Sequence, residues 1–274
     1  MKDMTIETAQ KGSPAPPAYV RDEVAHYEEQ IKKYRAGEVV SFTLETTAEE
    51  LKRVSDEFEN ASPEAILRWA GEQFGPDLAV ATGFGAEGCV LIAMLSGMRA
   101  DARIFYLDTD LLFPETYALR DRLEARYGVR FERRKTRVSL GDQAVEYGER
   151  LWERQPDLCC RLRKVEPLKE MLTGLRAWVT AIRREQSPAR ANIGLVERDE
   201  RFGLIKINPL ARWSTRDVSD YIARHDVPYN PLHDHGYPSI GCAPCTTPVQ
   251  IGEDARAGRW RGTSKTECGL HPAG

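Results

Sequence analysis

The sequence predicts an α/β fold, built on a largely parallel sheet with helices on both faces. Short apolar runs alternate with helical stretches through the middle of the chain. Several of these runs end in a loop that is rich in glycine or in charged residues. After about residue 228 the chain becomes irregular and rich in Gly, Pro and Cys. Strands that alternate with helices in this way are typical of parallel sheets covered on both sides.

The N-terminal part of the chain has a different character. Up to about residue 18 it is polar and rich in Pro, Ala and Gly, and a charged helical pattern follows over residues 20–35. We expect residues 1–45 to form a partly flexible arm and a helix. A further helical stretch is expected over residues 47–74, where Ser62-Pro63-Glu64 restarts the helix with proline in its first turn.

The alternation of strands and helices begins after residue 77. We expect residues 46–250 to form the main nucleotide-binding domain and residues 251–274 to form a mobile C-terminal tail. The expected strands cover residues 78–81, 102–107, 129–132, 177–181 and 204–207, and the expected helices cover residues 86–97, 114–127, 165–172 and 215–225.

Composition excludes several classes of protein. Hydrophobic residues make up 41% of the 274 residues and charged residues 30%, with a net charge of −3. A general nucleic-acid binder would carry a basic surplus, so no nucleic-acid partner is expected. No apolar stretch approaches the ~20 residues of a membrane span, and the N-terminus lacks the apolar core of a secretory signal. We therefore expect a cytoplasmic protein without a membrane partner.

Three loops follow expected strands, at residues 82–88, 108–114 and 183–190. Ligands of parallel sheets bind beyond the carboxyl ends of the strands, so these loops are candidates for a binding site. The first loop is glycine-rich and suits a phosphate, although it matches neither GxGxxG nor a Walker A loop, and an ordinary tight turn explains it equally well. Asp108 and Thr109 in the second loop can bind ribose hydroxyls or cap a helix. The third loop carries three arginines, which suit phosphate or sulfate or a solvated surface.

Four of the six cysteines form two pairs, Cys159-Cys160 and Cys242-Ala243-Pro244-Cys245. Six cysteines in an intracellular chain of this size indicate metal or redox chemistry rather than a disulfide framework. Four thiolates suit either zinc or an iron–sulfur cluster. Adjacent cysteines diverge, which favours a cluster with separate iron atoms. Zinc and a redox disulfide at the C-x-x-C pair remain open alternatives.

Cys268 lies near the C-terminus, after a segment with several Arg and Lys residues and close to His271. These neighbours favour the thiolate, which is the nucleophilic form of cysteine. A spare terminal thiol is the alternative. Cys89, on the apolar face of an expected helix, is interpreted as a small buried hydrophobic residue. His233 and His235 are interpreted as loop residues rather than zinc ligands.

Taken together and in order, the motifs resemble those of the assimilatory adenylyl-sulfate reductases, the iron–sulfur branch of the adenylyl-sulfate and phosphoadenylyl-sulfate reductase family. The resemblance covers residues 77–271. The motifs that carry it are Phe84-Gly85-Ala86-Glu87, Leu107-Asp108-Thr109, Pro114-Glu115-Thr116-Tyr117, Cys159-Cys160 with Arg163-Lys164, Arg183-Arg184-Glu185-Gln186-Ser187-Pro188, Gly241-Cys242-Ala243-Pro244-Cys245-Thr246, Gly258-Arg259-Trp260 and Glu267-Cys268-Gly269-Leu270-His271.

The resemblance implies a fold like that of the adenine-nucleotide α-hydrolases, the PP-loop group. It implies an oxidoreductase of sulfate assimilation and cysteine biosynthesis that acts on adenylyl sulfate. Cys268 would attack the sulfur atom and displace AMP, and thioredoxin would then reduce the S-sulfocysteine and release sulfite. Glutaredoxin remains an alternative donor, and a homo-oligomer remains open.

The resemblance also implies roles for individual residues. One 4Fe–4S cluster per chain would be held by Cys159, Cys160, Cys242 and Cys245. The catalytic residues would be Cys268, His271 and Lys164. The substrate-binding residues would be Thr82, Phe84, Gly85, Ala86, Glu87, Asp108, Thr109, Arg183, Arg184, Gln186, Ser187, Arg256 and Arg259.

Three positions depart from the family pattern: Gly88 stands where Asp is frequent, Asp110 where Gly is usual, and Thr247 where Arg is common. If Asp110 faces the ligand, its carboxylate disfavours a substrate with an extra phosphate. The alternative functions are a phosphoadenylyl-sulfate or dual reductase, an ATP-dependent PP-loop enzyme of tRNA thiolation, and a non-catalytic zinc-binding protein.

Overall fold

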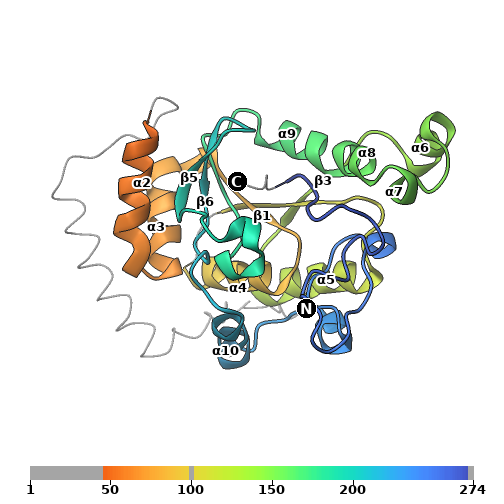
Figure 1. The fold of residues 1–274 in the computed structure, drawn as a ribbon. Helices are drawn as coiled ribbons and strands as arrows, with labels where there is room; N and C mark the ends of the chain where they lie inside the picture. The colour runs from red at the N-terminus through yellow and green to blue at the C-terminus, as the bar shows by residue number, and fades with distance from the viewer. Residues whose placement is uncertain (1–45, 99–101, 271–274) are drawn as a thin grey trace, which may run out of the picture. The chain divides into compact units, whose positions relative to one another are not determined.

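The computed structural model describes residues 46–98 and 102–270, which are drawn in colour in Figure 1. The predicted arm and helix within residues 1–45 lie outside the described residues, and so does His271. The proposed divisions at residues 45 and 250 stay predictions. In the part of the chain that is described, no helix is long and apolar enough to cross a membrane.

The centre of the fold is a six-stranded sheet with the strand order β3-β2-β1-β4-β6-β5. Four of its five strand pairs are parallel, and β5 pairs with β6 in the antiparallel direction. The predicted largely parallel sheet is therefore confirmed. The strands are β1 Leu78–Thr82, β2 Arg103–Leu107, β3 Phe131–Arg134, β4 Ala177–Val179, β5 Val196–Asp199 and β6 Leu204–Ile207.

The sequence did not predict β5, and it placed β3 two residues too early. The β5 segment reads Val-Glu-Arg-Asp and carries one apolar residue, so it lacks the apolar pattern of a buried strand. It lies at the edge of the sheet, where one side of the backbone has no strand neighbour. Its pairing with β6 depends on a tertiary contact that a local pattern does not contain.

The predicted helices are present. They are α2 Ala48–Glu57, α3 Pro63–Phe74, α4 Ala86–Gly97, α5 Pro114–Tyr127, α9 Glu166–Leu172 and α10 Thr215–His225. Three short helices were not predicted: α6 Leu140–Tyr147, α7 Leu151–Arg154 and α8 Pro156–Cys160. Short 3₁₀ turns occur at Phe58–Asn60, Gly75–Asp77, Arg184–Gln186, Pro188–Arg190, Pro231–His235 and Ala243–Cys245, and a π-helical turn covers Arg161–Val165.

Side-chain caps define where several helices begin. The hydroxyl of Ser62 accepts a hydrogen bond from the backbone N of Ala65 at 3.2 Å, and Pro63 occupies the first turn of α3. Thr47 and Glu50 form a reciprocal capping box at the start of α2. The predicted break between the two N-terminal helices is therefore confirmed.

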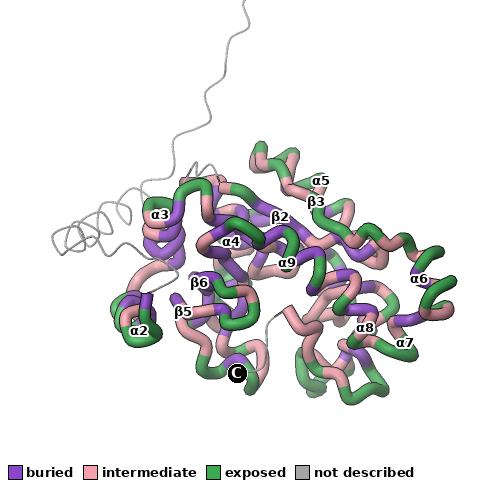
Figure 2. The backbone as a smooth tube through the Cα atoms, turned by 90° about the horizontal axis from the view of Figure 1, so that it is seen from above, coloured by how far each residue is buried: buried purple, intermediate pink, exposed green. Residues whose placement is uncertain are grey.

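Helices cover both faces of the sheet, and the central strands β1, β2, β4 and β6 are largely buried (Figure 2). On one face, Leu168, Met171 and Leu172 of α9 pack against Phe105 and Trp178 of the sheet. On the other face, the side chains of α4, α5 and α10 form a second cluster, which contains Cys89, Ile92, Tyr106, Leu119, Leu123 and Tyr221. Cys89 is completely buried, as predicted.

The strand order also determines where a ligand can bind. β1 lies between β2 and β4, so the connections after β1 and β4 leave the sheet in opposite directions. A crevice forms at such a reversal, outside the carboxyl ends of the two strands. The loops after β1, β2 and β4 meet at this edge.

One buried hydroxyl connects α2 with the sheet edge. Ser55 is 6% exposed, and its Oγ accepts hydrogen bonds from the backbone N of Leu195 at 2.8 Å and of Val196 at 3.4 Å. These two N–H groups lie at the start of β5 and have no strand neighbour on that side. Ser55 therefore holds the antiparallel edge against α2.

We predict that Ser55→Ala lowers the free energy of unfolding by about 1–3 kcal/mol, because the substitution leaves buried N–H groups without an acceptor. Urea unfolding monitored by circular dichroism measures the change. Ser219→Ala is the control, since its hydroxyl bonds an exposed carbonyl within α10, and it should change stability by less than about 0.5 kcal/mol. Equal stability of Ser55→Ala and wild type would show that α2 does not hold this edge.

Candidate active site

A cavity of about 960 Å³ opens at the carboxyl edge of the parallel strands. Its walls include Gly83, Gly85 and Glu87 after β1, Thr109 after β2, and Arg183 after β4. All three predicted strand-end loops therefore reach one space. A volume of this size is in the range of sites for a nucleotide-sized ligand.

The glycine loop after β1 is held by the side chain of Thr82. Its hydroxyl accepts a hydrogen bond from the backbone N of Phe84 at 3.0 Å, and Phe84 has a φ of 57°. A Cβ atom at Gly88 would lie 2.7 Å from the same hydroxyl oxygen. Gly88, which stands where Asp is frequent in the family, therefore allows the first turn of α4 to pack against the end of β1.

A carboxylate joins the first and third loops. Oε1 of Glu87 accepts hydrogen bonds from Nε of Arg183 at 2.9 Å and from Nε2 of Gln186 at 3.0 Å. Arg183 is 5% exposed and also donates to the backbone oxygen of Trp213 at 3.0 Å. The charge of Arg183 is therefore largely balanced within the protein, although its side chain lines the cavity.

Four of the residues proposed to bind substrate do not line the cavity: Phe84, Asp108, Arg184 and Ser187. The Phe84 side chain is 1% exposed and packs against Tyr106 in the core. Arg184 donates to the carboxylate of Glu59 and to the backbone oxygen of Ile193. Any contact of the Phe84 or Arg184 side chain with a ligand would require it to leave those partners.

Asp108 is fully buried and serves the framework of the second loop. Its carboxylate accepts hydrogen bonds from the Tyr117 hydroxyl at 2.7 Å, from Nε of Arg133 at 2.5 Å and from the backbone N of Asp110 at 2.9 Å. Burial by itself raises the pKa of Asp108, but these donors outweigh burial and bring the pKa below its ordinary value of 3.8.

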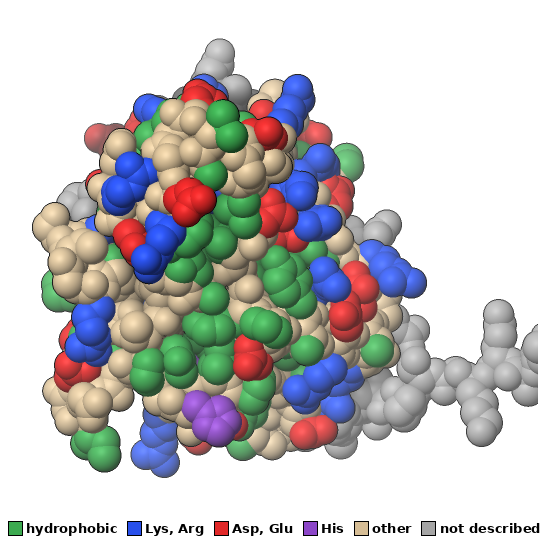
Figure 3. Space-filling view, turned by 90° about the vertical axis from the view of Figure 1, so that its right-hand side faces the viewer, with side chains coloured by type: hydrophobic (Ala, Val, Ile, Leu, Met, Phe, Trp, Pro, Cys, Tyr) green, Lys and Arg blue, Asp and Glu red, His purple; other side chains and the backbone are tan. Residues whose placement is uncertain are grey.

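Three cations line the cavity close to its cysteine: Lys164, Arg256 and Arg259. The guanidinium of Arg259 lies 4.5 Å from the ring centre of Trp260, and its buried Nε has no hydrogen-bond partner in the described structure. No carboxylate among the described residues pairs with Lys164 or Arg259. On the outer face drawn in Figure 3, by contrast, basic and acidic side chains lie beside one another. Lys164 and Arg259 therefore bring positive charge to the cavity without a paired carboxylate.

The C-terminal segment reaches the same cavity, because Glu267, Cys268 and Leu270 are part of its wall. Cys268 is partly exposed. Leu270 packs against the hydrophobic cluster that contains Leu168. The segment is therefore docked in this structure, and its predicted mobility stays a prediction.

The two cysteine pairs line one smaller pocket, together with Trp152 and Trp260. Cys159 and Cys160 end α8, directly before the π-helical turn. Cys242 precedes a 3₁₀ turn that ends at Cys245, and the second loop holds this turn through a hydrogen bond from the backbone N of Ala243 to the backbone oxygen of Leu111 at 2.7 Å. Segments about 80 residues apart thus bring four sulfur atoms to one place, as the sequence proposed.

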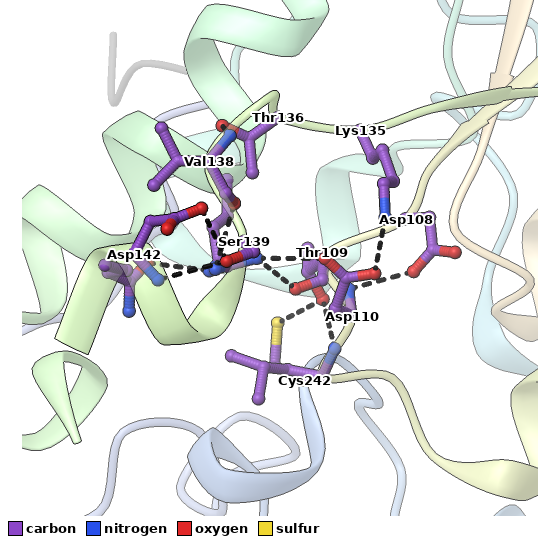
Figure 4. A network of polar contacts seen from close by, with 12 residues as sticks. Asp108, Thr109, Asp110, Lys135, Thr136, Val138, Ser139, Asp142 and Cys242 are labelled. Carbon is purple, nitrogen blue, oxygen red and sulfur yellow. Dashed lines mark hydrogen bonds and ion pairs between the residues drawn. The ribbon is translucent and has the colours of Figure 1, made fainter. Parts of the chain in front are cut away.

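The second loop also contacts a cysteine directly. Oγ1 of Thr109 lies 3.3 Å from Sγ of Cys242, as Figure 4 shows. The backbone oxygen of Thr109 accepts a hydrogen bond at 3.0 Å from Arg163, whose side chain is 1% exposed. Arg163 also contacts Asp110 at 3.2 Å. Asp110 is paired with cations and does not line the large cavity, so it does not face a ligand there.

Several facts bear on whether this pocket suits a metal cofactor. No group of three or more His, Cys, Asp or Glu residues in the described ranges could hold a metal ion. A cubane cluster makes a different demand, since each cysteine binds its own iron atom and the sulfurs need not converge on one point. Burial, and then the nearby sulfurs of Cys160, Cys242 and Cys245, raise the pKa of Cys159 to about 12. Three buried thiols and one partly buried thiol that repel one another as anions suit a positively charged group between them, so the donor set fits a 4Fe–4S cluster.

Lys164 lines both the small pocket and the large cavity. Burial by itself lowers the pKa of its amino group, but the sulfurs of Cys242, Cys268 and Cys160 reverse the effect, and the pKa lies above its ordinary value. Lys164 therefore carries a positive charge between the cysteine pocket and the space that faces Cys268.

The sequence indicated Arg190 only as one of three arginines that suit phosphate or sulfate, and it gave Glu267 no role of its own, yet both line the cavity. The two side chains form an ion pair at 3.0 Å. Arg190 was visible as the last arginine of the third loop, and Glu267 as the neighbour of Cys268. What the sequence did not reveal is that these segments, 77 residues apart, pair with each other.

Known proteins resemble this chain over most of its length. The sequence profile of a family described as phosphoadenosine phosphosulfate reductase domain matches residues 77–248. A protein from Salinibacter ruber named adenosine 5'-phosphosulfate reductase is 50% identical over 222 residues, which cover 81% of this chain and 88% of that protein. A Bacillus subtilis protein named adenosine 5'-phosphosulfate reductase 1 is 49% identical over 208 residues, which cover 76% of this chain and 89% of that protein.

Solved structures show the same fold. The crystal structure of phosphoadenylyl-sulfate reductase from Candida auris in a phosphate complex has a TM-score of 0.67 and 34% identity, and the match covers 76% of this chain and 100% of that one. The FMN adenylyltransferase of Candida glabrata in complex with ATP has a TM-score of 0.51 at 13% identity, covering 90% and 83% of the two chains, which concerns the fold alone. The predicted PP-loop fold is confirmed.

The buried Asp108 leads to a prediction about pH. Because its pKa is lowered by folding, its contribution to stability is present above about pH 4 and is lost as the pH falls through the folded pKa. We predict that Asp108→Asn lowers the free energy of unfolding by about 1–3 kcal/mol at pH 7, and that this difference shrinks below about pH 4. Urea unfolding at a series of pH values measures it.

Asp121→Asn is the matched control, since Asp121 pairs with Arg120 at 2.7 Å but is 63% exposed. An exposed pair is worth at most about 1 kcal/mol, so this variant should differ little from wild type at either pH. A difference between Asp108→Asn and wild type that is the same at pH 3 and pH 7 would contradict the assigned network.

Proposed function

We propose that this chain, which belongs to the phosphoadenosine phosphosulfate reductase family, reduces adenylyl sulfate to sulfite and AMP. It is an oxidoreductase that acts on sulfur in sulfate assimilation. The observation that carries the proposal is the place of Cys268, which lines the same cavity as the glycine loop and three cations. A nucleophile, a phosphate-binding loop and a cationic surface in one cavity are what displacement at a sulfate group beside a nucleotide requires.

The proposal places the substrate in the cavity in one orientation. The AMP part would lie along the loops after β1, β2 and β4, with its phosphate near the N-terminal end of α4. The sulfate group would then face Lys164, Arg256 and Arg259, which lie near Cys268. Arg183 and Gln186 contribute by holding Glu87 and thereby the glycine loop.

The first chemical step is attack of the Cys268 thiolate on the sulfur atom of adenylyl sulfate. A bond forms between the two sulfur atoms, and the bond from sulfur to the bridging phosphate oxygen breaks. The electron pair of that bond leaves with AMP. Phosphate is a good leaving group, so little help from an acid is needed. Cys268 now carries the sulfonate as S-sulfocysteine, and the nearby cations stabilise the negative charge.

The second step requires two electrons, which a dithiol can supply by exchange. A thiolate of thioredoxin attacks Sγ of Cys268, and sulfite leaves with the electron pair of the S–S bond. The second thiol of thioredoxin then breaks the mixed disulfide, which returns the Cys268 thiolate and leaves thioredoxin oxidised. Such a donor is kept reduced in the cytoplasm, where we place the reaction. His271 would orient or activate Cys268.

Cys159, Cys160, Cys242 and Cys245 would hold one 4Fe–4S cluster. When bound, the cluster would supply a fixed local charge beside Lys164 rather than electrons for turnover. The chain's own part is to keep Lys164 charged at the border of the two pockets and to hold the Cys242 loop through Thr109.

The second candidate substrate is phosphoadenylyl sulfate, which the relative from Candida auris is named for. The preference for the unphosphorylated substrate rests on the four cysteines and on the relatives named for adenosine 5'-phosphosulfate. Asp110 gives it no support, because this residue does not line the cavity. A tRNA-thiolation enzyme and a non-catalytic zinc protein leave the place of Cys268 in the cavity unexplained.

We predict that Cys268→Ser reduces sulfite release from adenylyl sulfate by at least about 10³-fold, because it removes the nucleophile. The assay uses reduced thioredoxin and compares adenylyl sulfate with phosphoadenylyl sulfate. Mass spectrometry of the wild type, incubated with substrate without a reductant, should find the sulfonate on the peptide that contains Cys268. Cys89→Ala is the control and should retain activity, since Cys89 is buried under α4 away from the cavity.

Wild-type activity in Cys268→Ser would exclude the mechanism. Faster turnover of phosphoadenylyl sulfate than of adenylyl sulfate by the wild type would instead assign the second candidate substrate.

We further predict that the protein, purified without oxygen, is brown and contains about four iron atoms per chain. Cys245→Ala should lose most of the iron and the absorbance near 400 nm, because one of the four ligands is missing. Iron, sulfide and zinc analysis with the absorbance spectrum measures this outcome, and Cys89→Ala should match the wild type. A colourless protein with one zinc ion per chain would exclude the cluster.

A further inference from the structure

The carboxylate next to Cys268 lies between two arginines. Both oxygens of Glu267 accept hydrogen bonds from Nη2 of Arg190 at 3.0 Å, and Oε2 accepts a further bond from Nη2 of Arg256 at 3.0 Å. The exposed fractions of the three side chains are 14% for Glu267, 10% for Arg190 and 17% for Arg256. Arg256 also donates to the backbone oxygen of Thr266 at 2.9 Å. Two cations therefore hold the two residues that precede Cys268.

We propose that Glu267 is a positioning residue, whose ion pair with Arg190 docks the C-terminal segment so that Cys268 faces the substrate cavity. The role rests on the proposed function, in which Cys268 is the nucleophile. Arg190 provides the fixed side of the pair, and Arg256 belongs to the segment that is docked. Neither Glu267 nor Arg190 touches the reacting atoms in this assignment.

Charge explains why a carboxylate stands at this place. Burial lowers the pKa of Arg256, Glu267 opposes this effect, and the neighbouring guanidinium groups of Arg190 and Arg259 lower the pKa further. Without a carboxylate between them, Arg190 and Arg256 would repel each other across the interface. Glu267 therefore turns a repulsive contact into an attractive one at the residue next to the nucleophile.

The fixed side of the pair is connected to the nucleotide loops. Nη1 of Arg190 donates to Oε1 of Gln186, and Nε2 of Gln186 donates to Glu87 at 3.0 Å. Glu87 belongs to the first turn of α4, directly after the glycine loop. A continuous chain of hydrogen bonds therefore runs from the glycine loop to Glu267. These hydrogen bonds thereby link the position of Cys268 to the position of the glycine loop, which is proposed to hold the nucleotide.

Leu270 of the segment packs against the cluster that contains Leu168. The other polar contacts of the segment are weaker anchors. Lys265 pairs with Asp157, but Asp157 is 87% exposed. Arg201 donates to the backbone oxygen of Gly269 on the exposed surface. Exposed pairs contribute little to stability, whereas a largely buried pair costs more when one partner is removed. The Glu267 pair is therefore the contact whose loss should release Cys268.

A different role for the same carboxylate would be competition with the anionic substrate for Arg256. The two roles differ in their kinetics. A positioning residue acts on the transition state, so its loss lowers kcat and leaves KM for adenylyl sulfate nearly unchanged. Removal of a competitor would lower KM and leave kcat unchanged.

The test compares Glu267→Gln, Glu267→Asp, Arg190→Met and the double variant Arg190→Met/Glu267→Gln in the holoenzyme. The first measurement is the rate at which iodoacetamide alkylates Cys268 without substrate, followed on its peptide by mass spectrometry. The alkylation rate can be measured without reductase activity, so this measurement tests the role of Glu267 even if the proposed function is wrong. The second measurement is kcat and KM for adenylyl sulfate with thioredoxin. Glu253→Gln is the matched control, because Glu253 pairs with Arg261 in the same segment but away from the cavity.

We expect Glu267→Gln to be alkylated about tenfold faster than wild type and to lose about tenfold in kcat, with KM little changed. Glu267→Asp should recover part of kcat, and the double variant should resemble either single variant, because the pair acts as a unit. Glu253→Gln should match wild type. An unchanged alkylation rate in Glu267→Gln, additive losses in the double variant, or a lower KM with unchanged kcat would each overturn the proposal. Thermal unfolding confirms that every variant compared is folded.

Discussion

Repulsion between anions is the constraint on which the arrangement of this site depends. In the proposed reaction, a thiolate has to approach a sulfate group that already carries negative charge, beside a phosphate that carries more. Three cations line the cavity that contains Cys268: Lys164, Arg256 and Arg259. Arg256 pairs with Glu267, but no carboxylate among the described residues pairs with Lys164 or Arg259. Such cations are worth more in a partly buried cavity than on an open surface, because water screens them less. Arg183 and Arg184, which the sequence proposed for the same task, instead have carboxylate partners and fix loops.

The fold supplies these cations from distant segments because parallel strands end at one edge. The reversal of strand order at β1 leaves a crevice for the nucleotide, and the loops after β2 and β4 close two of its sides. Lys164 enters from the π-helical turn before α9, and Arg256 and Arg259 enter from the irregular C-terminal part. The cysteine pocket lies where these two segments meet. A group bound there would connect them, so it would support the cationic side of the cavity as well as its own ligands.

Local patterns were enough to predict the parallel strands and the main helices, because residues close together in the sequence determine the apolar run of a buried strand and the cap of a helix. They failed for β5, whose four residues show no apolar alternation, and for α6 to α8, which are four to eight residues long. The motifs identified the loops that line the cavity, but they did not show which side chains of these loops face it. Phe84 belongs to a loop of the cavity, yet its own side chain packs in the core. The ion pair of Arg190 with Glu267 was not predicted, because the two residues are far apart in the sequence and only the fold brings them together.

A nucleophile on a terminal segment presents a further physical problem, since it has to meet two different partners. In the proposed mechanism, Cys268 lies close to the sulfur of the bound nucleotide in the first step and is reached by a protein dithiol in the second. A rigid element would satisfy the first demand and obstruct the second. A segment held by one largely buried ion pair, the packing of Leu270 and a few exposed contacts satisfies both, because the pair orders it while few contacts have to break for its release. Glu267 stands at the point where such control is most direct, one residue from the sulfur that reacts.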